Sequence, residues 1–311
     1  MRVIVTGGAG FIASHIATAH LARGDEVLVV DNLSAGRREH VPVGADFAEL
    51  DITDLPAMSE LWQRFRPEVV SHHAAQIDVR KSVADPAYDA HVNILGSLNV
   101  IKNCLEAGTA KLIFASTGGA IYGEPEQLPA TEDSPVRPMS LYGVAKYAAE
   151  QYLAAYGRLE GLNYTILRYG NVYGPGQRTD GEAGVVAIFA GLMLEGRQPT
   201  IFGRGDKTRD YVYVGDVVEA NLAAIERGAG GIYNIGTGVQ TTDQQVFEEV
   251  ARAAGYDGEP LYADERKGEV RHIALDCDRA HRELNWRAET QFADGIAQTV
   301  AYVRDGDTEL L

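Results

Sequence analysis

The segment that most constrains the fold of this chain spans residues 2–13 and reads RVIVTGGAGFIA. A short apolar strand runs into a glycine-rich turn, and a helical pattern follows directly. Gly7, Gly8 and Gly10 can adopt backbone angles that are closed to other residues, and they carry no Cβ. The next helix would offer unpaired N–H groups and its positive dipole end. The segment therefore predicts a backbone site for a dinucleotide pyrophosphate, with a purely steric glycine turn as the alternative.

A second apolar strand, residues 26–30, leads into Asp31 about 20 residues after the turn, where dinucleotide-binding folds carry a ribose-binding carboxylate. A carboxylate at this point accepts hydrogen bonds from the adenosine ribose hydroxyls and repels a 2′-phosphate. The position therefore favours NAD over NADP. Arg37 and Arg38 offer a phosphate contact as the alternative, but their distance from the strand end is typical of a solvated loop.

The composition is that of an ordinary globular protein, since 45% of the 311 residues are hydrophobic and 23% are charged. The chain has no run of 18 apolar residues and no leader pattern, so we expect no membrane span and a cytoplasmic location. A net charge of −16 argues against binding to nucleic acid or to an anionic membrane. Cys104 and Cys277 are far apart and lack CxxC spacing, which predicts neither a disulfide framework nor a metal site.

Short β-branched strands alternate with helical stretches up to about residue 170, which predicts a doubly wound α/β fold with a parallel sheet. We expect strands at 3–5, 27–30, 45–49, 69–72, 111–115, 164–168 and 231–235, and helices at 12–23, 55–65, 89–107, 141–160 and 214–227. Glycine-rich, aromatic and charged segments follow residue 170. The pattern predicts a Rossmann domain at 1–170 and 212–237 and a smaller C-terminal α/β substrate-binding region at 171–211 and 238–311.

Tyr142 and Lys146 lie four residues apart near the start of a strongly helical pattern, so they share one helix face. A phenol titrates near about pH 10, and an adjacent ammonium together with bound NAD⁺ favours its ionised form. The pair is a candidate for proton transfer, with an ordinary surface contact as the alternative. Proton transfer is favoured because Ser116 and Thr117 end a strand, and we expect both hydroxyls to face the same crevice as Tyr142.

His72 and His73 also end a predicted strand near this crevice. Neither has metal-ligating residues close to it in the sequence. The pattern therefore favours packing or contact with a cofactor edge over catalysis for both histidines.

Six segments together resemble the extended short-chain dehydrogenase/reductase family, and within it the UDP-glucose 4-epimerases. They are TGGAGFIASH, Asp31-Asn32-Leu33, FASTGGAIYGE, Tyr142-x-x-x-Lys146, LRYGNVYGPGQ and RDYVYVGD, and the resemblance covers nearly the whole chain. Ala13 departs from the pattern, because a third glycine often stands there. The resemblance implies an NAD-dependent enzyme that inverts C4 of a UDP-hexose through a transient 4-keto intermediate, and a homodimer built on helices 89–107 and 141–160.

The resemblance also implies roles for single residues. Thr117, Tyr142 and Lys146 match the catalytic positions. The positions that match cofactor contacts are Gly7, Gly10, Phe11, Ile12, Asp31, Asn32, Leu33, Ser34, Gly36, Asp51, Ile52, His73, Ala74, Ala75, Asn93, Ser116, Tyr142, Lys146 and Tyr169. The positions that match substrate contacts are Thr117, Tyr142, Asn171, Val185, Thr200, Phe202, Arg209, Arg266 and Glu269.

Two of these substrate positions could instead have a purely structural role. Arg209 could pair with the adjacent Asp210, and Phe202 could be a core residue. In the substrate-binding role, Arg209 and Arg266 would clamp diphosphate oxygens against the negative field of the chain.

In nucleotide-sugar 4,6-dehydratases an Asp-Glu pair follows the active-site Thr, whereas Gly118-Gly119 stand here. The open alternatives are an epimerase of another nucleotide sugar, such as a UDP-N-acetylhexosamine or a UDP-uronic acid, and a non-catalytic NAD-binding sensor.

Overall fold

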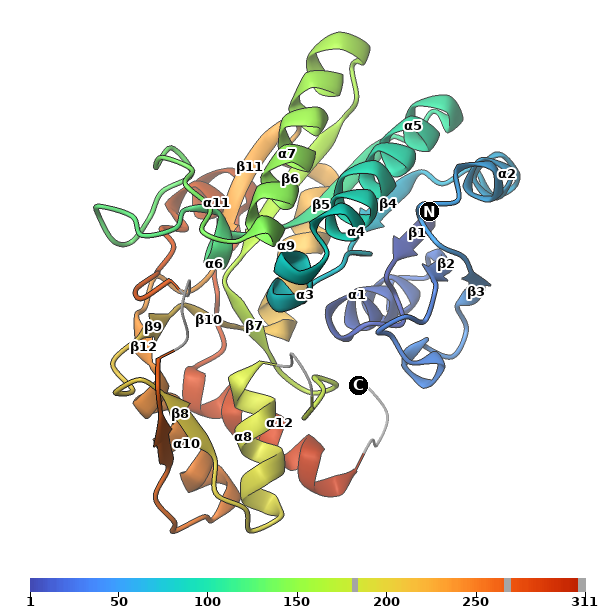
Figure 1. Ribbon diagram of the computed structural model, residues 1–311. Helices are drawn as coiled ribbons and strands as arrows, with labels where there is room; N and C mark the ends of the chain where they lie inside the picture. The colour runs from blue at the N-terminus through green and yellow to red at the C-terminus, as the bar shows by residue number, and fades with distance from the viewer. Residues whose placement is uncertain (181–183, 266–269, 307–311) are drawn as a thin grey trace.

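A parallel sheet of seven strands forms the centre of the protein, in the order β11-β6-β5-β4-β1-β2-β3 (Figure 1). The computed structural model describes residues 1–180, 184–265 and 270–306. The strands are β1 (Arg2–Thr6), β2 (Glu26–Asp31), β3 (Asp46–Glu49), β4 (Val69–His72), β5 (Lys111–Thr117), β6 (Tyr164–Tyr169) and β11 (Gly231–Ile235). The chain runs outward from β1 in both directions, which confirms the expected doubly wound fold.

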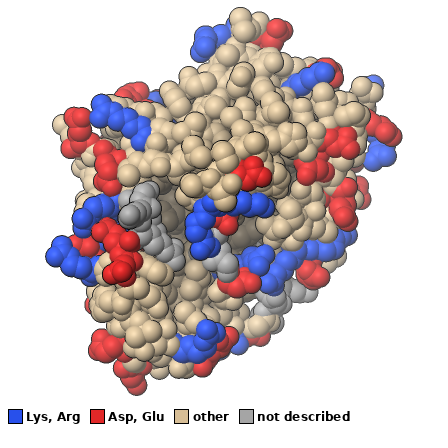
Figure 2. Space-filling view, in the orientation of Figure 1, with Lys and Arg blue, Asp and Glu red and all other residues tan. Residues whose placement is uncertain are grey.

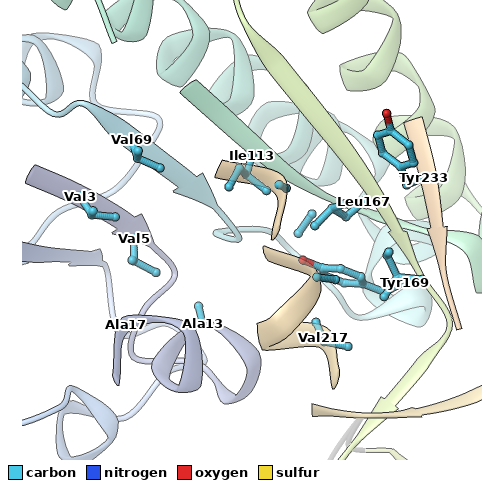
Figure 3. Close-up of a cluster of buried hydrophobic side chains, with 14 of the residues drawn as sticks. Val3, Val5, Ala13, Ala17, Val69, Ile113, Leu167, Tyr169, Val217 and Tyr233 are labelled. Carbon is cyan, nitrogen blue, oxygen red and sulfur yellow. The ribbon is translucent and has the colours of Figure 1, made fainter. Parts of the chain in front are cut away.

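Helices cover both faces of this sheet. Helices α1 (Phe11–Ala22) and α9 (Val214–Glu226) pack on one face, and α2 (Leu55–Phe65), α5 (Ser97–Ala107) and α7 (Leu141–Glu160) pack on the other. Successive strand residues alternate between these layers, so Val3 and Val5 belong to the first core while Ile4 belongs to the second. Figure 3 shows the first core, where Val217 of α9 lies beneath the strands.

The expected strands and most of the expected helices are confirmed, but the continuous helix at 89–107 is wrong. Helix α4 (Pro86–Ala90) begins earlier, because Asp85 caps its first turn and Pro86 occupies the first helical position. A π-helical turn, η2 (His91–Gly96), then separates α4 from α5. Helix α3 (Val79–Ala84) precedes this segment and was not expected.

A second region packs around its own core. Helices α8 (Val185–Leu194), α10 (Asp243–Ala254) and α12 (Phe292–Asp305) bury Phe189, Phe247 and Ile296. Three small sheets pair β7 (Asn171–Tyr173) with β10 (Tyr211–Tyr213), β8 (Thr200–Phe202) with β13 (Leu261–Ala263), and β9 (Thr208–Arg209) with β12 (Thr241–Thr242). The remaining elements are η1 (Arg38–His40), α6 (Gly118–Ile121) and α11 (Asp278–Leu284). The domain boundaries given above stay a prediction.

None of the helices in the described ranges is long and apolar enough to cross a membrane.

A buried ion pair fixes α7 to the sheet. Arg168 of β6 donates through Nε and Nη2 to both carboxylate oxygens of Glu150, at 3.0 and 2.6 Å. The two side chains are 2% and 0% exposed. Ser116 donates to the same carboxylate, and Arg168 Nη1 donates to the Tyr122 hydroxyl at 2.8 Å. Because both charges are removed from water and fully hydrogen-bonded, this pair sets how α7 sits on β5 and β6.

We expect Arg168→Met to lower the free energy of unfolding by about 3–5 kcal/mol, because it leaves the Glu150 carboxylate buried without its cation. Urea denaturation measures the loss. In the matched control, the double variant Glu150→Met/Arg168→Met, most of the stability should return, since no unpaired charge remains. A single variant as stable as the wild type would contradict the structural role of the pair.

Candidate active site

The glycine turn lies at the carboxyl end of β1, against the loop after β4. Gly7 has φ +72°, and a Cβ there would lie 2.7 Å from the backbone nitrogen of Ala74. Gly10 begins α1, and within the described residues no side chain caps this helix start. The first turn of α1, which includes Phe11 and Ile12, therefore presents backbone N–H groups to the crevice, as an anion-binding turn requires.

Asp31 ties the turn to the end of β2. Its two carboxylate oxygens accept hydrogen bonds from the backbone N–H groups of Ala9 and Leu33, at 3.0 and 2.8 Å. Burial raises the pKa of this carboxyl, and the two N–H groups act in the opposite direction. Asp31 thus lies at the carboxyl end of β2 beside the glycine turn, as predicted from its position in the sequence.

Other predicted cofactor positions surround this edge. Asn32 donates to Asp51 at 2.7 Å, and a Cβ on Gly36 would lie 2.8 Å from the Cβ of Ala9. Ser34 is exposed and Ile52 is 4% exposed, next to Asp51. Burial raises the pKa of Asp51, but hydrogen bonds from Thr53 and Asn32 outweigh it, so the carboxyl has a lowered pKa. The predicted cofactor positions at this edge of the sheet therefore include a connected set of loop residues.

Asn93 is turned inward by the π-helical turn. Its amide donates to the carbonyl of Gln76 and to Asp89, and its oxygen accepts from the Gln76 N–H. The side chain is 2% exposed. Asn93 thus holds the loop after β4, including Ala75, in place at the rim of the crevice.

His73 and Tyr169 form part of a closed ring of buried hydrogen bonds. Asn221 donates to the Tyr169 oxygen at 2.8 Å, so the Tyr169 hydroxyl donates to Nε2 of His73 at 3.1 Å. The other ring nitrogen of His73 then donates to Ser71 at 3.4 Å, and Ser71 donates back to Asn221 at 3.4 Å. Burial, followed by the charge of Lys146, lowers the pKa of His73 to about 3. The expected packing role of His73 is consistent with this neutral ring.

His72 is equally buried and contacts Thr6 and Ser97, at 2.7 and 3.1 Å. Burial lowers its pKa well below the usual range. Both histidines are therefore uncharged components of the sheet edge.

Lys146 lies on the buried face of α7, and Tyr142, one turn earlier, is half-buried. The Ser140 hydroxyl accepts from the Gly143 N–H at 3.1 Å and caps the helix, while Ser82 of α3 accepts from the Tyr142 N–H at 3.3 Å. Lys146 is 4% exposed, and its Nζ lies 4.4 Å from the centre of the Phe114 ring. Two serines thus fix the helix start that carries the tyrosine.

The expected lowering of the Tyr142 pKa concerned the protein with NAD⁺ bound, and it stays a prediction. Burial, and then the charge of Asp89, raises the pKa of the phenol. The pKa of Lys146 is lowered to about 8, because burial outweighs the stabilising charges of Glu150 and Asp89. The site as it stands holds a neutral phenol beside a cationic lysine.

Ser116 and Thr117 do not share one direction, which corrects the expectation that both face Tyr142. Adjacent strand residues point to opposite sides, and the Ser116 hydroxyl donates to Glu150 at 2.5 Å. Thr117 ends β5 beside Asn171: a Cβ on Gly119 would lie 3.2 Å from Asn171 Oδ1 and 4.0 Å from Thr117 Oγ1. The hydroxyl of Thr117 and the amide of Asn171 therefore both lie close to the position that a Cβ on Gly119 would occupy.

The predicted substrate positions come mostly from the second region. Arg209 Nη1 donates to the carbonyl oxygens of Thr208 and Arg271, at 2.9 and 3.3 Å. Asp210 does not pair with it, because its carboxylate accepts from Thr237, Gly238 and Leu275. Phe202, Val185 and Thr200 are partly buried at element ends, so the core alternative for Phe202 is not supported. Arg266 and Glu269 lie outside the described residues.

Several residues at the site were not expected from the sequence. Glu150 lies four residues after Lys146, so its spacing on α7 was a readable signal. Asp89, Gln76 and Asn221 had no such local signal, because their partners are distant in the sequence. In the described part of the chain, no group of three His, Cys, Asp and Glu side chains could hold a metal ion.

This chain belongs to the NAD dependent epimerase/dehydratase family, whose model matches residues 3–236. It is 43% identical over 306 residues to a putative UDP-glucose 4-epimerase of Methanocaldococcus jannaschii, covering 98% of this chain and 99% of the relative. The crystal structure of Thermotoga maritima UDP-glucose 4-epimerase with UDP-glucose is similar at TM-score 0.97 and 48% identity, covering 98% and 99% of the two chains. The Thermus thermophilus UDP-glucose 4-epimerase complex with NAD gives TM-score 0.93 and 48% identity, with the same coverage.

The buried His73 should make stability fall in acid. Its folded pKa of about 3 lies below the unfolded value of 6.5, so the unfolded state binds the extra proton between these values and stability decreases as the pH falls through them. We expect His73→Gln to reduce the slope of the free energy of unfolding against pH by about 1.4 kcal/mol per pH unit. Urea unfolding at several pH values measures this slope. The exposed His91→Gln is the control and should retain the wild-type slope. Equal slopes in His73→Gln and the wild type would contradict the neutral assignment.

Proposed function

We propose that this protein inverts C4 of a UDP-hexose, interconverting UDP-glucose and UDP-galactose with NAD as a resident cofactor. The observation that carries the proposal is the pair of a half-buried Tyr142 and a buried Lys146 on the first turns of α7, in a chain similar over nearly its whole length to UDP-glucose 4-epimerases. A cytoplasmic location stays a prediction.

The crevice fits NAD. The turn at Gly7 and Gly10 approaches another backbone too closely for a Cβ, leaves the start of α1 free of a side-chain cap among the described residues, and lies beside the carboxylate of Asp31. These features match a pyrophosphate and an adenosine ribose. The cofactor positions named from the sequence are those we propose to hold it. When bound, NAD supplies a hydride acceptor that can return the hydride to the opposite face of the sugar.

The proton is handled by Tyr142. We propose that its phenolic oxygen takes the proton from the C4 hydroxyl and returns it at the end of the cycle. Burial raises the pKa of the free phenol, so the oxygen needs added positive charge nearby before it can act as a base near neutral pH. Lys146, with a pKa of about 8, keeps most of its charge at pH 7 and supplies part of that field. Thr117 would hydrogen-bond the same sugar oxygen.

Gly118 and Gly119 favour an epimerase over a dehydratase. A Cβ on Gly118 would lie 2.5 Å from Leu275 Cδ1 and 3.2 Å from the Arg168 carbonyl oxygen. A Cβ on Gly119 would lie 3.2 Å from Asn171 Oδ1. Neither position carries the acid pair that a 4,6-dehydratase uses, and a side chain at Gly118 would have to displace Leu275, so a 4-keto sugar formed here would be reduced again.

The diphosphate must be bound against a net charge of −16. Figure 2 shows acidic and basic side chains interspersed over one face, with a group of basic side chains near its centre. We propose that Arg209 and Arg266 clamp the diphosphate, that Phe202 contacts the base, and that Asn171, Val185, Thr200 and Glu269 complete the sugar and nucleoside contacts. The planar fork of a guanidinium can donate to two phosphate oxygens at once.

The experiment is incubation of the purified protein with UDP-galactose and no added cofactor, followed by the anomeric NMR signals. Appearance of UDP-glucose supports the proposal. Turnover of UDP-N-acetylglucosamine or a UDP-uronic acid but not of UDP-galactose would show that the enzyme acts on another nucleotide sugar. A folded protein that contains NAD and converts none of these sugars would be a sensor.

We expect Tyr142→Phe to lower the epimerisation rate by about 100-fold or more while NAD remains bound, because the variant lacks only the proton acceptor. The NMR assay gives the rate, and the absorbance of released nucleotide gives the NAD content. Tyr152→Phe is the control, since Tyr152 lies on the same helix but is 44% exposed. A variant that retains about a tenth of the wild-type rate would refute the proton-transfer role.

We also propose a homodimer that packs the helices at 89–107 and 141–160 against their symmetry mates. Large apolar side chains are exposed on these helices, namely Leu95, Val144, Tyr152 and Leu159, at 50%, 47%, 44% and 78%. An interface on these helices would cover the exposed apolar side chains.

We expect Val144→Glu to convert the dimer into monomers, because it places a charge within the apolar interface. Sedimentation velocity measures the mass. Val239→Glu is the matched control, since Val239 is 58% exposed in the segment between β11 and β12. A Val144→Glu protein that sediments as the wild type does would place the interface elsewhere.

A further inference from the structure

The segment RDYVYVGD, residues 209–216, contains two buried aspartates that the proposed mechanism does not use. Asp210 is 0% exposed and lies between β9 and β10, and Asp216 is 6% exposed in the first turn of α9. A buried carboxylate is stable only when its oxygens accept hydrogen bonds. The donors to each aspartate therefore show which parts of the chain it holds in place.

The side chain of Asp210 joins two segments that are distant in the sequence. Its Oδ1 accepts from the backbone N–H and the hydroxyl of Thr237, at 2.7 and 2.8 Å. Its Oδ2 accepts from the N–H groups of Gly238 and Leu275, at 3.0 and 2.9 Å. Burial raises the pKa of this carboxyl, but the four donors favour its ionised form.

Two glycines leave the space that Asp210 occupies. A Cβ on Gly236 would lie 2.6 Å from Asp210 Oδ2, and a Cβ on Gly170 would lie 2.7 Å from the Asp210 carbonyl oxygen. The same carbonyl oxygen accepts from the Asn171 N–H at 2.6 Å. Asp210 is therefore closely enclosed, and its backbone is joined to Asn171, one of the predicted substrate positions.

The segment 271–275 connects Asp210 to the guanidinium of Arg209. Leu275, at the end of this segment, donates its N–H to Asp210 Oδ2. Arg271, at the start of the segment, accepts from Arg209 Nη1 through its carbonyl oxygen at 3.3 Å. The Asp210 carboxylate therefore fixes one end of the segment whose other end orients the Arg209 side chain.

We propose that Asp210 is a positioning residue for nucleotide-sugar binding, because it holds the Arg209 guanidinium and the Asn171 backbone in a fixed relation to each other. Asp210 acts through these two residues and not on the substrate itself. Its effect on substrate binding rests on the proposed function. Its anchoring of the segment 271–275 does not.

The substitution Asp210→Asn keeps the size of the side chain but makes one of its two ends a donor. An amide has one acceptor oxygen and one donor nitrogen, whereas both oxygens of Asp210 meet donors. In either orientation the amide nitrogen would face a backbone N–H group. The segment 271–275 or the turn at 237–238 must then move away from the side chain.

The test compares Asp210→Asn with the wild type, both with resident NAD. We expect the KM for UDP-galactose, and the Kd for UDP measured by calorimetry, to rise by about 10-fold or more. The kcat should change less, and the NAD content should stay at the wild-type value. This split separates a role in substrate binding from a general loss of structure.

Asp216→Asn is the matched control. The Asp216 carboxylate also accepts from two backbone N–H groups and one hydroxyl, those of Glu289 and Thr290, at 3.2 Å each. Neither of these partners is a predicted substrate or cofactor position. We therefore expect Asp216→Asn to retain the wild-type KM and the wild-type Kd for UDP.

Hydrogen–deuterium exchange of the ligand-free protein tests the anchoring without a substrate. The N–H groups of residues 271–275 should exchange faster in Asp210→Asn than in the wild type or Asp216→Asn. If Asp210→Asn does not fold, Thr237→Val removes a single donor from an exposed residue and should raise the KM by about threefold. Thr237→Ser keeps the hydroxyl and should retain the wild-type KM.

A wild-type KM in the folded Asp210→Asn protein, unchanged exchange at 271–275, or an equal rise in KM in Asp216→Asn would overturn the proposal. A wild-type protein that binds no UDP and converts no nucleotide sugar would overturn the proposed function. In that case the exchange measurement still decides whether Asp210 anchors the segment 271–275.

Discussion

The Arg168/Glu150 ion pair is the interaction on which the geometry of the candidate site depends. It joins β6 to α7 inside the protein, and Ser116 at the end of β5 and Tyr122 after it bond to the same pair. Tyr142, Lys146 and Glu150 recur every four residues on one face of α7, so fixing Glu150 also fixes the rotation of the helix. A contact two helical turns away thus helps to set the rotation of the helix turn that carries Tyr142.

The two halves of the crevice are positioned by different means. The glycine turn is held by backbone contacts, with Gly7 against Ala74 and Asp31 bonded to the N–H groups on either side. The side that carries the proposed catalytic pair is held by buried polar side chains, namely the ion pair, the hydrogen-bonded ring that includes His73 and Tyr169, and the bonds between Asn93 and Gln76. A backbone cradle binds a charged cofactor without needing its own charge, while the side-chain network tunes the charge of the reacting groups.

The features that could be predicted from the sequence are those that depend on a few neighbouring residues. The sheet, the turn and the Tyr142/Lys146 spacing follow from periodicities that a few neighbouring residues show. The directions of Ser116 and Asn93 could not be read in this way, because each is set by a partner on another element. The raised pKa of Tyr142 was missed for the same reason: it depends on burial and on Asp89, which is distant in the sequence. The Arg209/Asp210 pairing failed because Asp210 meets backbone N–H groups of two later loops.

The amino-acid sequence by itself determined the doubly wound fold, the glycine turn and the spacing of the proposed catalytic pair, since strand and helix periods and glycine backbone freedom act over short stretches of chain. The tertiary structure alone decided that Glu150 pairs with Arg168, and that burial raises the pKa of Tyr142 and lowers that of Lys146. Electrostatic interactions in a buried cluster depend on distance and on exclusion of water, and both arise only when α4, α7 and β6 come together.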